Sequence, residues 1–235
     1  AAMDLKPGDV DFILHAARVV SLARSPQQAL VLAHEAVPLA WNNGAICQQL
    51  SAIFAKANAY ESASRLSGRA LELLPADTRN VFNHATTSLF NGDLDAAEAA
   101  YRQVIAREPN HAQAHLGLAQ LRKWTAEVNH IDRLTSSLNR IRDPAGRMYM
   151  HLALGKEYED VGNHPSAFLH FSAGKREGKA LARFGTNVDH ACFDALSAES
   201  DRLDGTDGYQ SAEPIFVIGM PRTGTTLVDR ILSSH

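Results

Sequence analysis

Small apolar residues recur at a fixed interval along the first half of the chain, inside stretches that alternate apolar and polar positions with a helical period. Alanine is favoured where two helices approach closely, because bulkier side chains would hold the helix axes apart. The interval therefore predicts packed helix pairs that repeat every 34 residues. Three series keep this spacing: Ala29, Ala63 and Ala97; Ala36, Ala70 and Val104; and Pro75 and Pro109.

The clearest single repeat covers residues 78–111. Gly92-Asp93 is expected to end its first helix. Ala97 and Tyr101 lie at helix-packing spacing in the second helix, which Pro109 stops. A 34-residue period is typical of tetratricopeptide repeats (TPRs), in which each unit is a pair of antiparallel helices. An unrelated helical bundle would have to produce three series at one period by coincidence, so we predict a TPR solenoid over residues 1–183.

Helix-start signals agree with this phase. Ser25-Pro26 and Asn163-His164-Pro165 each place a polar cap before a proline in the first turn. A helix over residues 127–141 is expected to lack the small-residue pattern and to end before Asp143-Pro144, which makes its unit degenerate. The predicted units lie near 10–43, 44–77, 78–111, 112–146 (degenerate) and 147–181. A connecting region follows at 184–208, with a helix near 188–203 and a turn-rich stretch at 204–208.

Composition narrows the class of protein. The 235 residues are 45% hydrophobic and 21% charged, an ordinary balance for a soluble protein. A net charge of −3 argues against a general binder of nucleic acid or anionic membranes. Cys47 and Cys192 lie far apart, in neither metal nor redox spacing. No stretch approaches the ~18 apolar residues of a membrane span, so a cytoplasmic protein is expected. His111 and His115 are four apart, but no third ligand accompanies them, and no metal site is predicted.

The segment around residues 214–226 carries the most specific chemistry in the chain. Pro214 introduces an apolar run at 215–218 that is expected to form a strand. Gly219 and Gly224 bound a loop, and a helical pattern then opens with two threonines. Strand, glycine loop and helix N-terminus together form an anion cradle, because the loop amides and the helix dipole point at one place. The predicted ligand is a phosphate group.

One position decides which phosphate chemistry this loop favours. The spacing of Gly219 and Gly224 fits a nucleotide-triphosphatase loop, but Thr225 stands where that motif requires lysine, and the only basic residue of the loop is Arg222. The loop resembles the 5′-phosphosulfate loop of sulfotransferases that use 3′-phosphoadenosine 5′-phosphosulfate (PAPS), in the branch that includes protein-tyrosine sulfotransferases. The stretch at 216–228, Phe-Val-Ile-Gly-Met-Pro-Arg-Thr-Gly-Thr-Thr-Leu-Val, with 231–235 after it, is similar to bacterial TPR sulfotransferases.

The resemblance implies a role for each loop residue. Arg222 would contact the phosphosulfate and act as the catalytic residue, and no metal would be needed. Met220 would help to shape the turn. Asp229 is expected to be an exposed helical residue and not a base. The cofactor-binding residues implied by the resemblance are Gly219, Pro221, Arg222, Thr223, Gly224, Thr225 and Thr226.

The predicted fold is mostly α: a TPR helical solenoid, then the first β-strand, phosphate loop and helix of an incomplete α/β P-loop-like sulfotransferase domain at 209–235. A lone strand cannot bury its faces or satisfy its edges. We therefore expect about 100 to 200 further residues, with the catalytic base and the 3′-phosphate ligands beyond His235. The chain alone is expected to be inactive.

The first helix of each repeat is expected to line a concave groove for a protein or peptide partner. The leading functional hypothesis is a PAPS-dependent sulfotransferase, with tyrosine favoured slightly over carbohydrate and small-molecule hydroxyls as acceptor. The alternatives are a non-catalytic TPR scaffold and a nucleotide kinase or hydrolase. Trp41 and Trp124 can also be read as packing residues. The candidate groove residues are Gln48, Lys56, Asn83, Phe90, Gln120 and Trp124.

Overall fold

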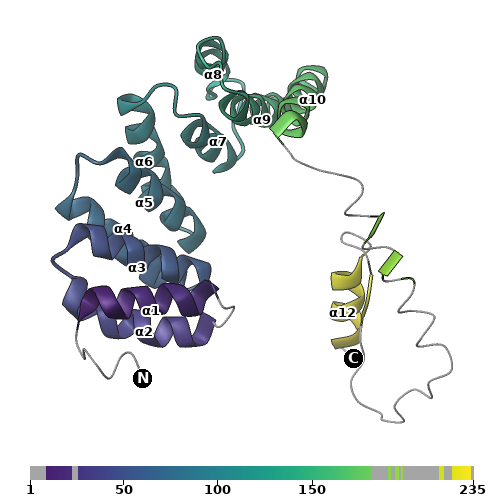
Figure 1. Cartoon of the computed structure of the whole chain (residues 1–235). Helices are drawn as coiled ribbons and strands as arrows, with labels where there is room; N and C mark the ends of the chain where they lie inside the picture. Colours follow the sequence, from purple (N-terminus) through teal and green to yellow (C-terminus); the bar gives the residue numbers. More distant parts are fainter. Residues whose placement is uncertain are drawn as a thin grey trace. The chain divides into compact units, whose positions relative to one another are not determined.

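The computed structural model describes residues 9–22, 26–181, 190–191, 194–195, 197, 217–219 and 224–233. The chain divides into two compact units, 1–183 and 184–235. The described part of the first unit is entirely helical apart from its connections (Figure 1). Its helices are α1 (Val10–Leu22), α2 (Pro26–Ala40), α3 (Gly44–Lys56), α4 (Tyr60–Leu73), α5 (Thr78–Asn91), α6 (Leu94–Arg107), α7 (Ala112–Gln120), α8 (Ile131–Leu138), α9 (Pro144–Asp160) and α10 (His164–Leu181).

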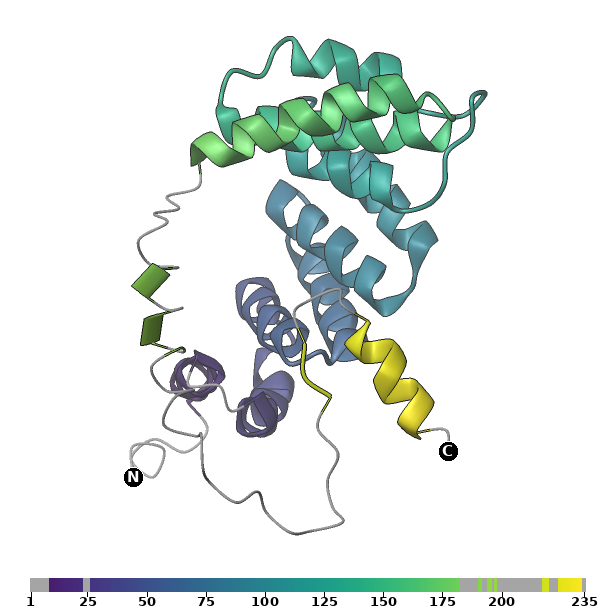
Figure 2. The same cartoon turned by 90° about the vertical axis from the view of Figure 1, so that its right-hand side faces the viewer.

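Consecutive helices pack as hairpins. The pairs α1–α2, α3–α4, α5–α6 and α9–α10 each pack closely together, and the first three pairs stack in chain order in both views (Figures 1 and 2). The alanines of one repeating series, Ala29, Ala63 and Ala97, lie on the second helices of the first three pairs and are fully buried. Local side-chain size therefore sets how closely the paired helices approach, as the 34-residue series predicts.

Local signals also fix the helix ends. Gly92 takes a left-handed conformation, with φ of 86°, directly after α5, and Asp93 caps α6 by accepting a hydrogen bond from the Ala96 amide. Asn163 caps α10 in the same way, through the Ser166 amide. The first helix of the last pair begins at Pro144, earlier than the unit predicted from residue 147, because Asp143 caps it through the Gly146 amide at 2.6 Å.

The degenerate fourth unit departs from a helical hairpin. Its helices α7 and α8 pack chiefly on α9 and not on each other, and α7 also packs on α6. The helix expected over 127–141 is only α8, residues 131–138, because the preceding segment is a turn: the Asn129 side-chain amide donates to the carbonyls of Thr125 and Ala126. Residues 121–130 thus form an irregular connection between α7 and α8.

Among the described residues of the first unit, buried apolar side chains form three clusters. One joins α1–α4, a second joins α5–α7 with part of the connection after α7, and a third joins α7–α9. The contact between α4 and α5 includes polar groups: Ser67 Oγ lies 3.0 Å from His84 Nδ1 and 2.7 Å from Thr87 Oγ1. Burial is the main cause of a lowered pKa for His84, so its neutral ring is favoured at this junction.

The described part of the second unit contains the helix α12, Thr225–Ser233. None of the described residues forms a β-strand; of the predicted strand, 217–218 are described and 215–216 lie outside the described residues. The connecting helix expected near 188–203 also falls largely outside them, although the described positions there are helical.

Candidate functional site

Gly224 forms the turn that opens α12. Its φ of 88° lies in the left-handed region, which a side chain would strain. Its carbonyl oxygen accepts hydrogen bonds from the amides of Leu227 at 3.0 Å and Val228 at 3.1 Å. The amides of Thr225 and Thr226 lie in the first turn, where a helix provides no partner for its N–H groups. This is the local geometry that the anion cradle requires at its helical end.

The rest of the predicted cofactor loop is only partly described. Gly219 is exposed, and Thr226 is more exposed than the half-buried Thr225. Met220, Pro221, Arg222 and Thr223 lie outside the described residues, so the role assigned to Arg222 stays a prediction. Asp229 is exposed on α12, in line with the sequence-based interpretation. The apolar side chains of α12 are exposed as well: Leu227, Val228 and Ile231.

The groove candidates do not form one continuous site. Gln48 and Asn83 line a common cavity of about 230 Å³ between α3 and α5. Lys56 lies at the opposite end of α3 and is exposed. Phe90, at the end of α5, is 57% exposed and stacks on Tyr60 with ring centroids 5.3 Å apart. Gln120, the last residue of α7, is exposed.

Trp124 is not a groove residue. Only 5% of it is exposed, its Nε1 donates to the Ala119 carbonyl at 3.0 Å, and its ring meets that of His130 edge-on at 4.5 Å. The groove assignment assumed that α7 continues to residue 124, but α7 ends at Gln120. The alternative interpretation of Trp124 as a packing residue is the one the structure supports. Trp41 is partly exposed, and the guanidinium groups of Arg65 and Arg69 lie over its ring.

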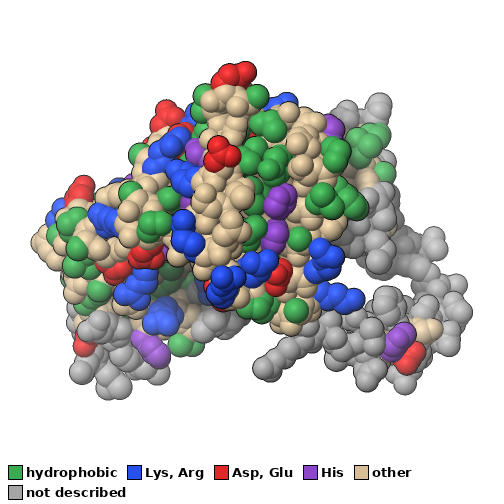
Figure 3. All heavy atoms as spheres, turned by 90° about the horizontal axis from the view of Figure 1, so that it is seen from above, with side chains coloured by type: hydrophobic (Ala, Val, Ile, Leu, Met, Phe, Trp, Pro, Cys, Tyr) green, Lys and Arg blue, Asp and Glu red, His purple; other side chains and the backbone are tan. Residues whose placement is uncertain are grey.

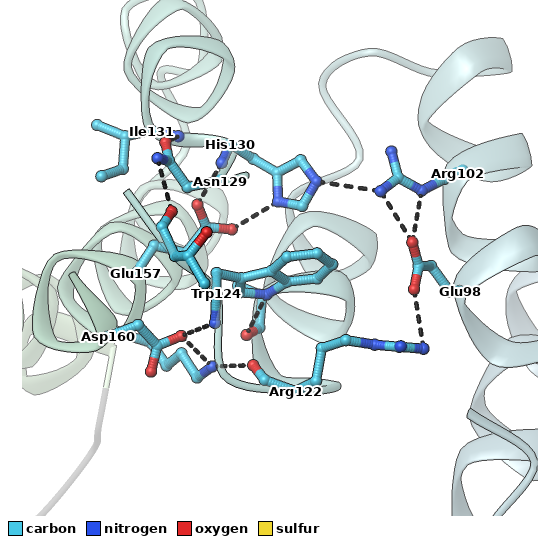
Figure 4. A network of polar contacts seen from close by, with 12 residues as sticks. Glu98, Arg102, Arg122, Trp124, Asn129, His130, Ile131, Glu157 and Asp160 are labelled. Atoms are coloured by element: carbon cyan, nitrogen blue, oxygen red, sulfur yellow. Dashed lines mark hydrogen bonds and ion pairs between the residues drawn. The ribbon is translucent and has the colours of Figure 1, made fainter. Parts of the chain in front are cut away.

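A polar network that the sequence did not indicate holds the connection after α7 (Figure 4). The carboxylate of Glu157 on α9 is fully buried. It accepts hydrogen bonds from the backbone amide of His130 at 2.5 Å and from its ring Nδ1 at 2.8 Å. Asp160, one turn along α9, accepts from the Trp124 amide at 2.9 Å and pairs with Lys156 at 2.5 Å. One face of α9 thus fixes both ends of the irregular connection.

The network continues outward to α6. The His130 Nε2 lies 3.5 Å from the Arg102 guanidinium, which pairs with Glu98 at 2.8 Å. Glu98 also pairs with Arg122 at 2.9 Å. Figure 4 shows the Glu157 carboxylate directed toward His130 and the Glu98 carboxylate between the two arginines. The polar groups of this network pair with one another within the fold, so we assign the network a structural role: it holds the degenerate unit in place.

Four histidines of the helical unit make hydrogen bonds within the fold. His111 caps α7 by accepting from the Ala114 amide, and the buried His115 donates through Nε2 to the Pro109 carbonyl at 2.9 Å. Burial is the largest cause of a lowered pKa for His115. His151 and His170 join α9 to α10 through their Nδ1 atoms at 3.0 Å, and burial lowers the pKa of both rings. Within the described residues no three metal-capable side chains converge.

On the face shown in Figure 3, basic and acidic side chains are interspersed among apolar ones. No helix in the described part of the chain combines the length and apolar character needed to cross a bilayer.

Comparison with known proteins identifies two regions of similarity. The sequence model of the sulfotransferase family matches residues 214–235. An uncharacterized protein of Aquifex aeolicus (strain VF5) is 29% identical over 162 residues, which cover 65% of this chain. The match spans only 20% of that relative's own length.

Solved structures resemble the helical unit. A Podosopora anserina protein with nearly identical TPR-like repeats aligns with a TM-score of 0.57 at 14% identity, covering 76% of this chain and 99% of that one. The RS-1 MamA double mutant aligns at 0.56 and 17% identity, covering 74% and 97%. YrrB, titled a TPR protein with an unusual peptide-binding site, aligns at 0.51 and 12% identity, covering 75% and 90%. The fold of the helical unit is a TPR-like solenoid.

Proposed function

We propose that this chain is part of a PAPS-dependent sulfotransferase whose TPR-like module binds a protein or peptide partner. The observation that carries the proposal is the agreement between two features of the same short segment. The sulfotransferase family model matches residues 214–235, and Gly224 there opens the helix α12, whose N-terminus is the kind of site at which helices bind anions. The loop also carries Arg222 and lacks the lysine of nucleotide triphosphatases.

The proposed chemistry is sulfuryl transfer to an acceptor hydroxyl. PAPS supplies the sulfuryl group: a bond forms between the acceptor oxygen and sulfur as the bond from sulfur to the 5′-phosphate oxygen breaks. The acceptor proton passes to a base that we do not assign to a residue of this chain. Negative charge grows on the departing phosphate, where Arg222 and the amides of residues 223–226 would stabilise it. The hydroxyls of Thr225 and Thr226 would add hydrogen bonds.

The repeat module supports a role in binding a macromolecule. TPR-like helix pairs form an extended concave surface, and solenoids use such surfaces to bind partners. Its neighbour YrrB is titled as having a peptide-binding site. Lys56, Phe90 and Gln120 remain exposed and available for contact. We propose a protein or peptide partner, with protein tyrosine as the favoured acceptor.

Calorimetric titration of the full-length protein with adenosine 3′,5′-bisphosphate, in buffer without divalent metal, tests the catalytic part of the proposal. Saturable binding that Arg222→Ala weakens is expected. The rival function is a non-catalytic TPR scaffold, favoured by the large share of the described residues that belongs to the repeat module. Absence of bisphosphate binding would favour that rival. Binding of ATP that depends on Mg²⁺ would instead indicate a nucleotide kinase or hydrolase.

A further inference from the structure

The interface between α9 and α10 contains two histidine rings that face each other. His151 on α9 and His170 on α10 approach with their Nδ1 atoms 3.0 Å apart and their ring centroids 5.2 Å apart. The two nitrogens therefore lie between the rings, and one of them must carry a proton that the other accepts. The ring of Tyr158 stacks on His170, with centroids 5.4 Å apart, and helps to hold its orientation. This hydrogen bond exists only while one of the two Nδ1 atoms has no proton.

The two helices approach closely on either side of this contact. A Cβ added at Gly174 of α10 would lie 3.2 Å from the Cβ of His151. One added at Gly155 of α9 would lie 2.7 Å from the ring of Phe171. Glycine at these two positions therefore lets the helix axes approach more closely than larger residues would. Side chains in such an interface have little room to separate while α10 keeps its place on α9.

The surroundings of the pair disfavour a second proton. Burial is the largest cause of a lowered pKa for His151, followed by the neighbouring His170 and by Arg147. Glu177 of α10 acts in the opposite direction, but it is paired with Arg147 at 2.8 Å, and Arg176 lowers the pKa of His151 further. Burial also lowers the pKa of His170. Two arginines and one glutamate thus face the pair, so the charges around it do not compensate for a second positive ring.

The position of α10 makes this contact decisive for one helix. α10 packs along α9, as both views show (Figures 1 and 2), whereas α9 also packs on α7 and α8. The first unit ends at residue 183, shortly after α10. If the α9–α10 interface opened, α9 would therefore keep its own partners, and α10 would lose the helix on which it packs.

We propose that the pair of His151 and His170 is a pH-sensitive switch that holds α10 on α9 and releases it when both rings are protonated. With two protons each Nδ1 is a donor, so the hydrogen bond is lost and two positive rings face each other across a close interface. In the open form each ring can hold its proton in water. Histidine pairs suit this role because their ordinary pKa lies near neutral pH. The proposal needs no nucleotide and does not depend on the sulfotransferase assignment.

Hydrogen exchange followed by mass spectrometry tests the switch on the whole chain, in buffer with a metal chelator, at about pH 7.5 and 5.5. For two rings with a pKa of about 6.5 in the open form, the opening equilibrium of α10 should rise by up to about a hundredfold across this range. His170→Gln keeps a hydrogen-bonding side chain but removes one titrating ring, so the rise should not exceed about tenfold. His164→Gln, which removes an exposed histidine at the start of the same helix, is the matched control and should respond as the wild type does. Amides of α2 should change little.

Four results would overturn the inference. One is unchanged protection of α10 while nuclear magnetic resonance shows both rings titrating, because His170 would then turn into solvent without moving the helix. Equal loss of protection in α2 and α10 would indicate unfolding of the whole module. A pH response of His170→Gln equal to that of the wild type would remove the role of the pair. A response seen only without the chelator would indicate a metal ion between the rings.

Discussion

Glu157 is the residue whose substitution tests the degenerate repeat most directly. Its fully buried carboxylate accepts two hydrogen bonds from His130 and so holds residues 121–130 against α9. Glu157→Gln keeps the size of the side chain but removes the charge and one acceptor. One His130 donor then remains buried without a partner, which costs about 1–3 kcal/mol, and the other bond loses its charge assistance, worth about 1 kcal/mol.

The expected loss in the free energy of unfolding is therefore about 3 kcal/mol. For a module of this size that corresponds to a fall in Tm of about 6–12 °C. Urea unfolding followed by far-UV circular dichroism measures the free energy, and hydrogen exchange of the His130 amide reports the local opening. Glu159→Gln is the matched control, because Glu159 is exposed on the same helix and its change is expected within about 0.5 kcal/mol. A free energy for Glu157→Gln equal to that of the control would refute the role of this carboxylate.

Three further predictions follow from other positions. The pKa of both His151 and His170 is lowered in the folded state, so the unfolded chain binds more protons and the free energy of unfolding should fall as the pH drops below about 6.5. His170→Gln should reduce this pH dependence in urea unfolding between about pH 7.5 and 5.5, and a variant with the wild-type dependence would contradict the argument. Gly117→Ala places a Cβ 2.5 Å from the ring of Tyr101 and should lower the free energy of unfolding by about 1–3 kcal/mol. In Gly178→Ala the new Cβ meets only the flexible Met148 Sδ, at 2.9 Å, so this control should be close to neutral, and equal effects of the two variants would disprove the steric argument. In the active enzyme, Arg222→Ala should lower turnover by about 10²–10³ in a sulfuryl-transfer assay, while Asp229→Asn should not change it, and near-normal turnover of the arginine variant would contradict its assignment.

The helical repeat could be predicted because its determinants are local. Close approach of paired helices needs small side chains at a fixed interval, and Ala29, Ala63 and Ala97 are buried as that requirement predicts. Gly92 was recognisable as a helix end because glycine adopts the left-handed conformation without strain. The turn at Gly224 was recognisable for the same reason.

The connection after α7 could not be predicted, because its determinants are distant in sequence. Trp124 is fixed by Asp160 and His130 by Glu157, partners 36 and 27 residues away. A helical period extended through this stretch therefore predicts Trp124 on the concave groove, whereas its side chain is buried. The burial of Asn80 could not be predicted for another reason: a polar residue in the first turn of a helix usually faces solvent, whereas this one is only 3% exposed.

The separation of the core into clusters has a consequence for how the module comes apart. The first cluster spans α1–α4, the second begins at α5, and Ser67 meets His84 and Thr87 across the junction through hydroxyl and imidazole groups. In linear arrays, stability is approximately a sum of the stabilities of the units and of the contacts between neighbouring units. Leu71 of α4 also packs against the second cluster, so apolar and polar contacts together join the two halves, and a chain cut between α4 and α5 would leave each fragment with a buried apolar cluster of its own.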